Sequence, residues 1–180
     1  MILEQLLQYR QRPREVKATE RLSHPEAYPG LAPWKEHETQ VRFIELPSFR
    51  PYSVWTLQVQ GTAARVRRIE WDHVTDVRLW DAFPDAEPTT YGADAQLPFE
   101  DARQVLDELA SIRMPPFLPV HTLGIDGVTC AIEFGNHWRS ATLSWWGNPP
   151  DEWHQMVHSY RSAIMLFERF LPASTARNRQ

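Results

Sequence analysis

The feature that most constrains the fold is a pair of alternating apolar and polar runs that only two residues separate. The runs cover residues 53–60 and 63–71, and Gly61 and Thr62 stand between them. A period of two residues is typical of a strand with one buried face, and a short link that contains glycine predicts a β-hairpin. The centre of the chain therefore predicts an antiparallel sheet.

Other segments are expected to extend this sheet or to form helices beside it. The turns Asp126-Gly127 and Gly135-Asn136 predict a three-stranded antiparallel meander near the C-terminus. The further expected strands are residues 41–46, an edge strand at 75–80, and the meander strands 120–123, 128–134 and 138–146. The expected helices are residues 2–9, a helix that begins near Pro98, and residues 152–170 with Asp151 as N-cap. Pro13 is expected to end the first helix, and residues 23–34 and 81–95 are expected to be loops.

The length and the order of these segments indicate the domain organisation. A chain of 180 residues fits one domain. We expect a single α+β domain over residues 1–172 and a flexible C-terminal tail over residues 173–180. The expected fold class is α+β, with a mostly antiparallel sheet of about six or seven strands in hairpins and helices packed on one face.

The number of cysteines and the length of the apolar runs indicate the cellular compartment. The single cysteine, Cys130, lies in an apolar run and is expected to be a buried side chain without a disulfide partner. No stretch approaches the roughly 20 apolar residues of a membrane span, and the N-terminus lacks the pattern of a signal peptide. The sequence therefore predicts a cytoplasmic protein without a membrane contact.

Charge is distributed unevenly along the chain. The net charge is -4, but residues 71–120 hold 3 Arg against 10 Asp and Glu, a local charge of -7. Phosphates would be repelled there, so nucleic acid is excluded as a partner of this region. A basic protein surface is the favoured partner instead.

Within this acidic region, aromatic residues alternate with carboxylates, and a second aromatic pair lies near the C-terminus. Trp145 and Trp146 are adjacent on a predicted strand, so they point to opposite faces of the sheet. The candidate partner-binding residues are Asp76, Trp80, Asp81, Phe83, Asp85, Glu87 and Trp146. Charges of this kind steer an encounter and aromatic residues anchor it. A solvated acidic face and tryptophans that close a strand-to-helix junction are the alternatives.

Catalytic and cofactor motifs are scarce. The chain has no glycine-rich phosphate loop and no nucleophile elbow. His154 and His158 have the spacing of two zinc ligands on a helix, but Gln155 stands where a metalloprotease has its glutamate base. We therefore expect no metal and no cofactor. An enzyme with a dispersed site is the alternative, and its polar residues would be His73, Asp76, Glu133, His137 and Arg139.

The C-terminal third carries a resemblance. Its residues are the turns Asp126-Gly127 and Gly135-Asn136, the run Ser144-Trp145-Trp146-Gly147, and Pro150 followed three residues later by Trp153. This order, over residues 123–170, resembles small uncharacterised bacterial proteins. Some of those are found beside toxin genes and are thought to act as immunity proteins. The resemblance implies a cytosolic protein that neutralises a toxin, and it carries over no catalytic residue.

Together these patterns favour a non-catalytic protein-binding protein over an enzyme. The leading expectation is an immunity protein that occludes a toxin or effector, with the acidic segment against a basic toxin domain. A structural or oligomeric accessory protein is the third alternative, because the sequence leaves the oligomeric state open.

Overall fold

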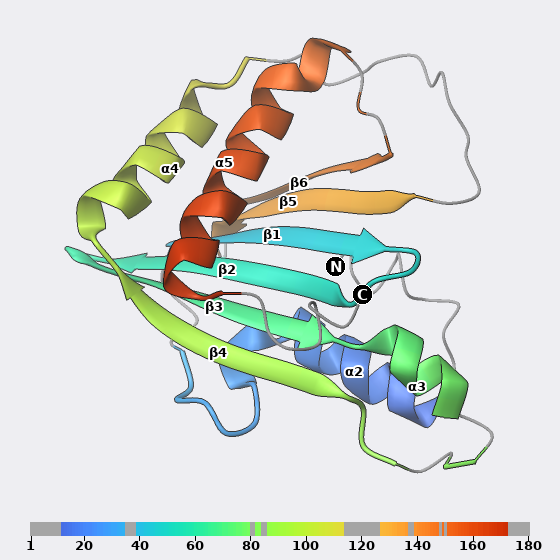
Figure 1. Ribbon diagram of the computed structural model, residues 1–180. Coiled ribbons are helices and arrows are strands. Elements are labelled where there is room, and N and C mark those ends of the chain that lie inside the picture. The colour runs from blue at the N-terminus through green and yellow to red at the C-terminus, as the bar shows by residue number, and fades with distance from the viewer. Residues whose placement is uncertain are drawn as a thin grey trace.

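The computed structural model describes residues 12–34, 39–79, 82–83, 86–113, 127–136, 139–147, 149 and 151–172. In this part of the chain, six strands form one sheet in the order β4-β3-β2-β1-β5-β6, and every neighbouring pair is antiparallel (Figure 1). The strands are β1 (Thr39–Pro47), β2 (Tyr52–Gln60), β3 (Ala63–Trp71), β4 (Thr90–Leu97), β5 (Val128–Asn136) and β6 (Arg139–Trp146). The helices are α2 (Pro13–Ser23), α3 (His73–Leu79), α4 (Phe99–Ser111) and α5 (His154–Phe170), with 3-10 turns η1 (Pro25–Ala27) and η2 (Asp151–Trp153). The predicted α+β class with a mostly antiparallel sheet is confirmed.

The hairpin at the centre of the prediction forms the middle of the sheet. β2 and β3 pair from Tyr52 opposite Trp71 to Gln60 opposite Ala63. Gly61 in the connecting turn has a φ of 58°, a left-handed conformation that glycine adopts without a steric penalty. The expected strands at 41–46 and 128–134 are also present, as parts of β1 and β5.

The main hydrophobic core lies between the sheet and helices α4 and α5, on the side that we call the α5 face (Figure 1). Phe43 and Trp55 of the sheet are fully buried there against Phe167 of α5. The rings of Phe43 and Phe167 meet edge to face, with their centroids 5.4 Å apart. Aromatic side chains supply much of this core because each buries a large apolar area.

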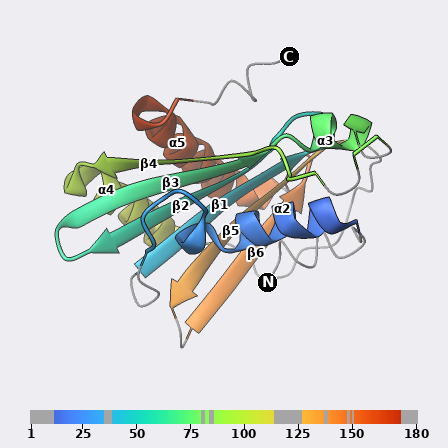
Figure 2. The same cartoon turned by 90° about the horizontal axis from the view of Figure 1, so that it is seen from below.

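A second core lies on the opposite side of the sheet, which we call the α2 face. Helix α2 runs along this side (Figure 2) and buries Ala18 and Leu22 against Ile44 and Ile69. Helices therefore cover both faces: α4 and α5 occupy one face as expected, and α2 adds a partial cover on the other.

A polar clamp next to this second core holds the segment after α2. Arg67 of β3 is fully buried and bonds both carboxylate oxygens of Asp94 at 2.6 and 2.7 Å. Its guanidinium also donates to the carbonyl oxygens of Pro25 and Ala32, each at 2.6 Å. Trp34 lies over the same guanidinium, 4.5 Å from the ring centroid. Residues 23–34 were predicted as a loop, and apart from Ser23, which ends α2, and the turn η1 they are one.

Two sequence expectations about local structure are wrong, and one helix was not predicted. Residues 75–80 were expected as an edge strand, but α3 occupies this segment, because Asp72 caps a helix there. β4 lies within residues that were expected to be a loop, since its many small side chains give little strand signal and its pairing with β3 is not local. Helix α2 was not predicted; it begins at Pro13, where the missing N–H of proline has no cost.

The predicted C-terminal meander is corrected as well. β5 pairs with β6 as expected, but its other edge is occupied by β1 from Gln40 to Pro47. Residues 120–123, the helix expected at 2–9 and the tail at 173–180 lie outside the described residues.

Candidate protein-docking site

One end of the sheet carries most of the features that the sequence associates with binding. The β1–β2 turn, the start of β5, the end of β6 and helix α3 meet at this end, on the right of Figure 1. We call it the α3 end. Strand pairing fixes its layout, because Pro47 lies opposite Val128 and Thr129 lies opposite Trp146.

Backbone ties hold the β1–β2 turn against the start of β5. Ser48 donates its N–H and its hydroxyl to the carbonyl oxygen of Gly127, both at 3.0 Å. The Gly127 N–H donates back to the Ser48 hydroxyl oxygen at 3.2 Å. On the other side of β5, the Gly147 N–H donates to the carbonyl oxygen of Val128 at 2.9 Å. The turn is therefore fixed, although it lies on the surface.

His73 ties the same turn to α3. Its Nε2 lies 3.4 Å from the carbonyl oxygen of Ser48, and its ring stacks on Tyr52 with the centroids 3.9 Å apart. Val77 follows His73 by one helical turn, so both residues lie on the same side of α3. The contact therefore places this side of α3 beside the turn that carries Phe49.

Exposed apolar side chains gather at this end. Phe49 in the β1–β2 turn is 74% exposed, and Phe83 after α3 is 59% exposed. Val77 and Leu79 of α3 are exposed as well. These four are among only seven large apolar side chains that are exposed in the described residues. A concentration of this kind is typical of an interaction surface.

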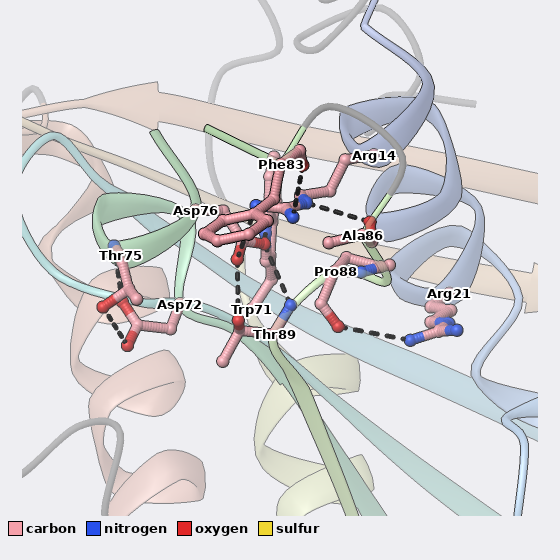
Figure 3. A network of polar contacts seen from close by, with 10 residues as sticks. All are labelled: Arg14, Arg21, Trp71, Asp72, Thr75, Asp76, Phe83, Ala86, Pro88 and Thr89. Carbon is pink, nitrogen blue, oxygen red and sulfur yellow. Dashed lines mark hydrogen bonds and ion pairs between the residues drawn. The ribbon is translucent and has the colours of Figure 1, made fainter. Parts of the chain in front are cut away.

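The start of α3 is capped by Asp72. Its Oδ1 accepts the backbone N–H of Thr75 at 3.1 Å, and its Oδ2 accepts the Thr75 hydroxyl at 2.8 Å (Figure 3). A carboxylate that satisfies a free N–H of the first turn stabilises a helix. This cap explains why a segment with strand-like alternation folds as a helix.

Asp76 anchors α3 from inside the protein. Its carboxylate is 1% exposed and accepts hydrogen bonds from Trp71 Nε1 at 2.7 Å, from the Thr89 N–H at 2.9 Å and from the Thr89 hydroxyl at 2.7 Å. The Arg14 guanidinium lies 3.7 Å from it (Figure 3). A buried carboxylate needs such partners, because the loss of hydration is otherwise too costly.

Arg14 also holds the segment that carries Phe83. Its Nη2 donates to the carbonyl oxygen of Phe83 at 2.8 Å, and its Nε donates to the carbonyl oxygen of Ala86 at 2.9 Å (Figure 3). The Phe83 backbone is thus fixed from α2 while its ring projects outward. An aromatic side chain on a fixed backbone loses little conformational entropy when it enters a partner.

Glu87 is bound to α2 at the surface. Its carboxylate accepts hydrogen bonds from Lys17 at 2.7 Å and from Arg21 at 2.5 Å. The hydrogen bond from Lys17 is the main cause of a lowered pKa of Glu87; desolvation opposes it, and the positive charges of Lys17 and Arg21 lower the pKa further. Arg21 also reaches the Thr90 hydroxyl, which extends the link between α2 and the start of β4.

The predicted partner-binding residues therefore differ in their exposure and in their contacts within the protein. Phe83 is on the surface as expected. Asp76 is a correction, because it is buried and satisfied by internal partners, and Glu87 is exposed but paired with cations of α2. The other three residues of the acidic segment, Trp80, Asp81 and Asp85, lie outside the described residues.

Trp146 is half-buried at the same end of the sheet. Its ring lies against Gly127, where a side-chain carbon in place of the glycine hydrogen would come within 2.7 Å of the ring. Gly127 is the residue that binds Ser48, so Trp146 lies next to the fixed β1–β2 turn. Its neighbour Trp145 faces the opposite side and is buried in the main core, as expected from strand geometry.

The residues proposed for a dispersed catalytic site do not converge in the part that the structure describes. His73 and Asp76 are buried at the α3 end, whereas Glu133 pairs with Arg42 on the α2 face at 3.7 Å. His137 and the side chain of Arg139 are outside the described parts. Cys130 is a poor nucleophile, because burial and the nearby Glu45 carboxylate raise its pKa to about 11. No three His, Cys, Asp or Glu side chains of the described residues are grouped to hold a metal ion.

Sequence reasoning missed Phe49, Val77 and Leu79. Phe49 lies in a turn between Pro47 and Pro51, where a large apolar side chain cannot reach a core, and this was the signal that could have found it. Val77 and Leu79 were assigned to a strand, and a strand would bury one of its faces.

Comparison with known proteins adds no relative. No family model, no curated protein and no solved structure matches the chain. In the described residues, no helix is long and apolar enough to cross a membrane.

Proposed function

We propose that this protein is a non-catalytic binding protein and that its partner, another protein, docks on the α3 end. The observation that carries the proposal is the exposure of Phe49, Val77, Leu79 and Phe83 together at one end of the sheet. Binding energy at protein interfaces is concentrated in a few aromatic and apolar anchors. Phe49 and Phe83 are the expected anchors, because both are large and project from a fixed backbone.

Two observations support a particular class of partner for this site. The C-terminal resemblance supports a toxin or effector that the protein neutralises by occluding it. The local charge of -7 over residues 71–120 supports a partner with a basic surface. Asp76 and Glu87 are neutralised within the protein, so the apolar anchors supply most of the affinity and the remaining carboxylates contribute mainly to the rate of encounter.

Affinity capture from the native cells tests the proposal, with mass spectrometry of what co-purifies. The variant Phe49→Ser with Phe83→Ser removes both anchors, whereas Met165→Ser removes an exposed apolar side chain from α5 as a matched control. We expect a stoichiometric partner with the wild type and with Met165→Ser, and its loss with the double variant. Equal capture by all three proteins would show that the partner binds elsewhere.

Measuring the association and dissociation rates of the captured partner at increasing salt concentration tests the basic-surface proposal. Steering by charge predicts an association rate that falls with ionic strength and a dissociation rate that changes little. An association rate independent of salt would reject the basic surface and leave the apolar docking site in place.

A further inference from the structure

The outer edge of β6 is a second surface without a cover in the described part of the chain. Within the described residues, β6 is the last strand of the sheet, and its eight residues pair with β5 without interruption from Trp146 opposite Thr129 to Arg139 opposite Asn136. Residues 140–146 contain neither a charged residue nor a proline. Ser140, Thr142 and Ser144 are exposed. Proteins usually protect an edge strand with charges, prolines or bulges, and β6 has none of these over seven residues.

The opposite edge of the same sheet is protected. Strand β4 carries the exposed residue Asp94, which is held by Arg67. The Tyr28 ring packs on Gly92, and Arg21 binds Thr90. The two edge strands of the sheet thus differ in how well they are protected against pairing, and this difference indicates that the edge of β6 has a function.

We propose that β6 pairs in antiparallel fashion with β6 of a second copy of this chain, so that the two six-stranded sheets become one continuous sheet. The edge is self-complementary, because no like charges oppose each other when residues 140–146 of two copies are paired. The two copies are related by a two-fold axis, which is the commonest symmetry of soluble oligomers.

The side chains favour an axis at Leu143. Thr142 of each copy then lies opposite Ser144 of the other, a pair of hydroxyl residues that can form a hydrogen bond. On the α5 face, Leu143 lies opposite its own counterpart and Ala141 lies opposite Trp145. Leu143 is half-buried and Ala141 is exposed in the single chain, so pairing covers apolar surface as well.

This arrangement leaves the proposed docking site free. Antiparallel pairing places the Trp146 end of one strand beside the Ser140 end of the other. The two α3 ends therefore point in opposite directions, and each remains accessible. The edge of β6 is a different surface from the proposed docking site, and pairing there does not depend on docking at the α3 end.

Sedimentation analysis of the full chain at micromolar concentrations tests the pairing. Thr142→Lys places a charge on the exposed edge, opposite Glu133 of the neighbouring strand β5, so it should leave the single chain folded. Gln96→Lys places the same charge at an exposed position of β4. We expect the wild type and Gln96→Lys at twice the chain mass of 21.0 kDa, and Thr142→Lys at the mass of one chain.

Cross-linking provides a second measurement. In a Cys130→Ser background, Leu143→Cys is expected to form a disulfide between two copies on oxidation, since residues at the axis of an antiparallel pair are close enough to be bridged. Gln96→Cys, on the opposite edge of the sheet, is expected to form no such disulfide. A wild type that sediments as one chain, a Thr142→Lys variant at twice the mass, or a Leu143→Cys variant that does not cross-link would each overturn the proposal. Loss of partner capture by the Phe49 and Phe83 variant has no bearing on these results.

Discussion

The guanidinium of Arg14 lies between α2 and the segment after α3, where it faces the Asp76 carboxylate and two carbonyl oxygens. It joins residues that are more than 60 positions apart in the sequence. Nothing in the local sequence distinguishes Arg14 from the other arginines near it. Its role arises only when α2 packs on the sheet, so sequence patterns could not have identified it.

Replacing Arg14 by methionine is expected to lower the free energy of unfolding by about 3 kcal/mol, because Asp76 keeps a buried charge without its cation. Lys17→Met removes a cation from the exposed pair with Glu87 and should cost much less, because water and salt screen an exposed ion pair. Urea denaturation of both variants measures the difference. Equal losses would mean that the buried ion pair contributes no more than the exposed one.

Cys130 illustrates how burial changes the chemistry of a side chain. Its thiolate is disfavoured by desolvation first and by the Glu45 carboxylate second, which raises the pKa from 9.0 to about 11. The apolar run around it predicted a buried cysteine, and the structure places it half-buried against the main core.

We expect Cys130 to react slowly with iodoacetamide at pH 8 in the folded protein and much faster in urea, because only the thiolate reacts. The folded state holds this proton more tightly than the unfolded state. Its contribution to stability is therefore complete below pH 9 and is lost as the pH rises toward 11. The Cys130→Ser variant lacks this loss and serves as the control. A rapid reaction of the folded protein at pH 8 would contradict the raised pKa.

At the scale of the elements, the alternating strands were predicted well because polar and apolar side chains alternate along them, although both faces of β2 and β3 are largely buried. α3 was mistaken for a strand because Asp76 to Leu79 also alternate between polar and apolar residues. The helix depends on the cap at Asp72, which precedes the alternating residues. β4 was missed because its small residues become a strand only through β3, a partner that local patterns do not reveal.

The cap can be tested directly. Asp72→Ala should destabilise the protein by about 1 kcal/mol, since the Thr75 N–H and hydroxyl lose their acceptor. Asp72→Asn keeps an oxygen in the same place and should lose much less. If the proposed docking site is correct, Asp72→Ala also weakens partner capture, because Val77 and Leu79 lose their fixed positions. Thermal unfolding and capture are measured on the same samples, and equal effects of the two substitutions would argue against a cap.

The edge strand β4 depends on a close contact with the segment after α2. A side-chain carbon at Gly92 would lie 2.4 Å from the Tyr28 ring, so Gly92→Ala must displace that ring. We expect a loss of roughly 1 to 3 kcal/mol. In a Tyr28→Ala background the same substitution should cost less, because the obstacle is gone. A double-mutant cycle from urea denaturation measures this coupling, and additive losses would contradict the contact.

At the scale of the whole molecule, the two faces of the sheet are covered by cores of different size and chemistry. The α5 face is filled by a continuous apolar core beneath two helices. The α2 face combines a smaller apolar cluster with the buried arginines Arg14 and Arg67. The sequence predicted the first cover, since the last helix has a clear apolar side. It did not predict the second, because a short helix after Pro13 was not expected and arginines are rarely buried.

This asymmetry predicts two different responses to equivalent cavities. Phe167→Ala removes a buried ring from the main core and should lower the global free energy of unfolding by about 3 to 5 kcal/mol. Leu22→Ala should cost about 2 to 5 kcal/mol, but we expect α2 to open locally while the sheet and α5 persist. Because Arg14 and Arg67 hold surrounding segments from the same face, local opening would also release Phe83 from its fixed position.

Amide hydrogen exchange distinguishes these responses residue by residue. In Leu22→Ala, the amides of α2 should lose protection while those of β1, β2 and α5 keep it. In Phe167→Ala, protection should fall across all elements together. Uniform loss in both variants would show that the two faces unfold as one unit, and α2 would then be as integral to the fold as α5. A selective loss would identify α2 as the element through which the α3 end can be loosened without unfolding the sheet.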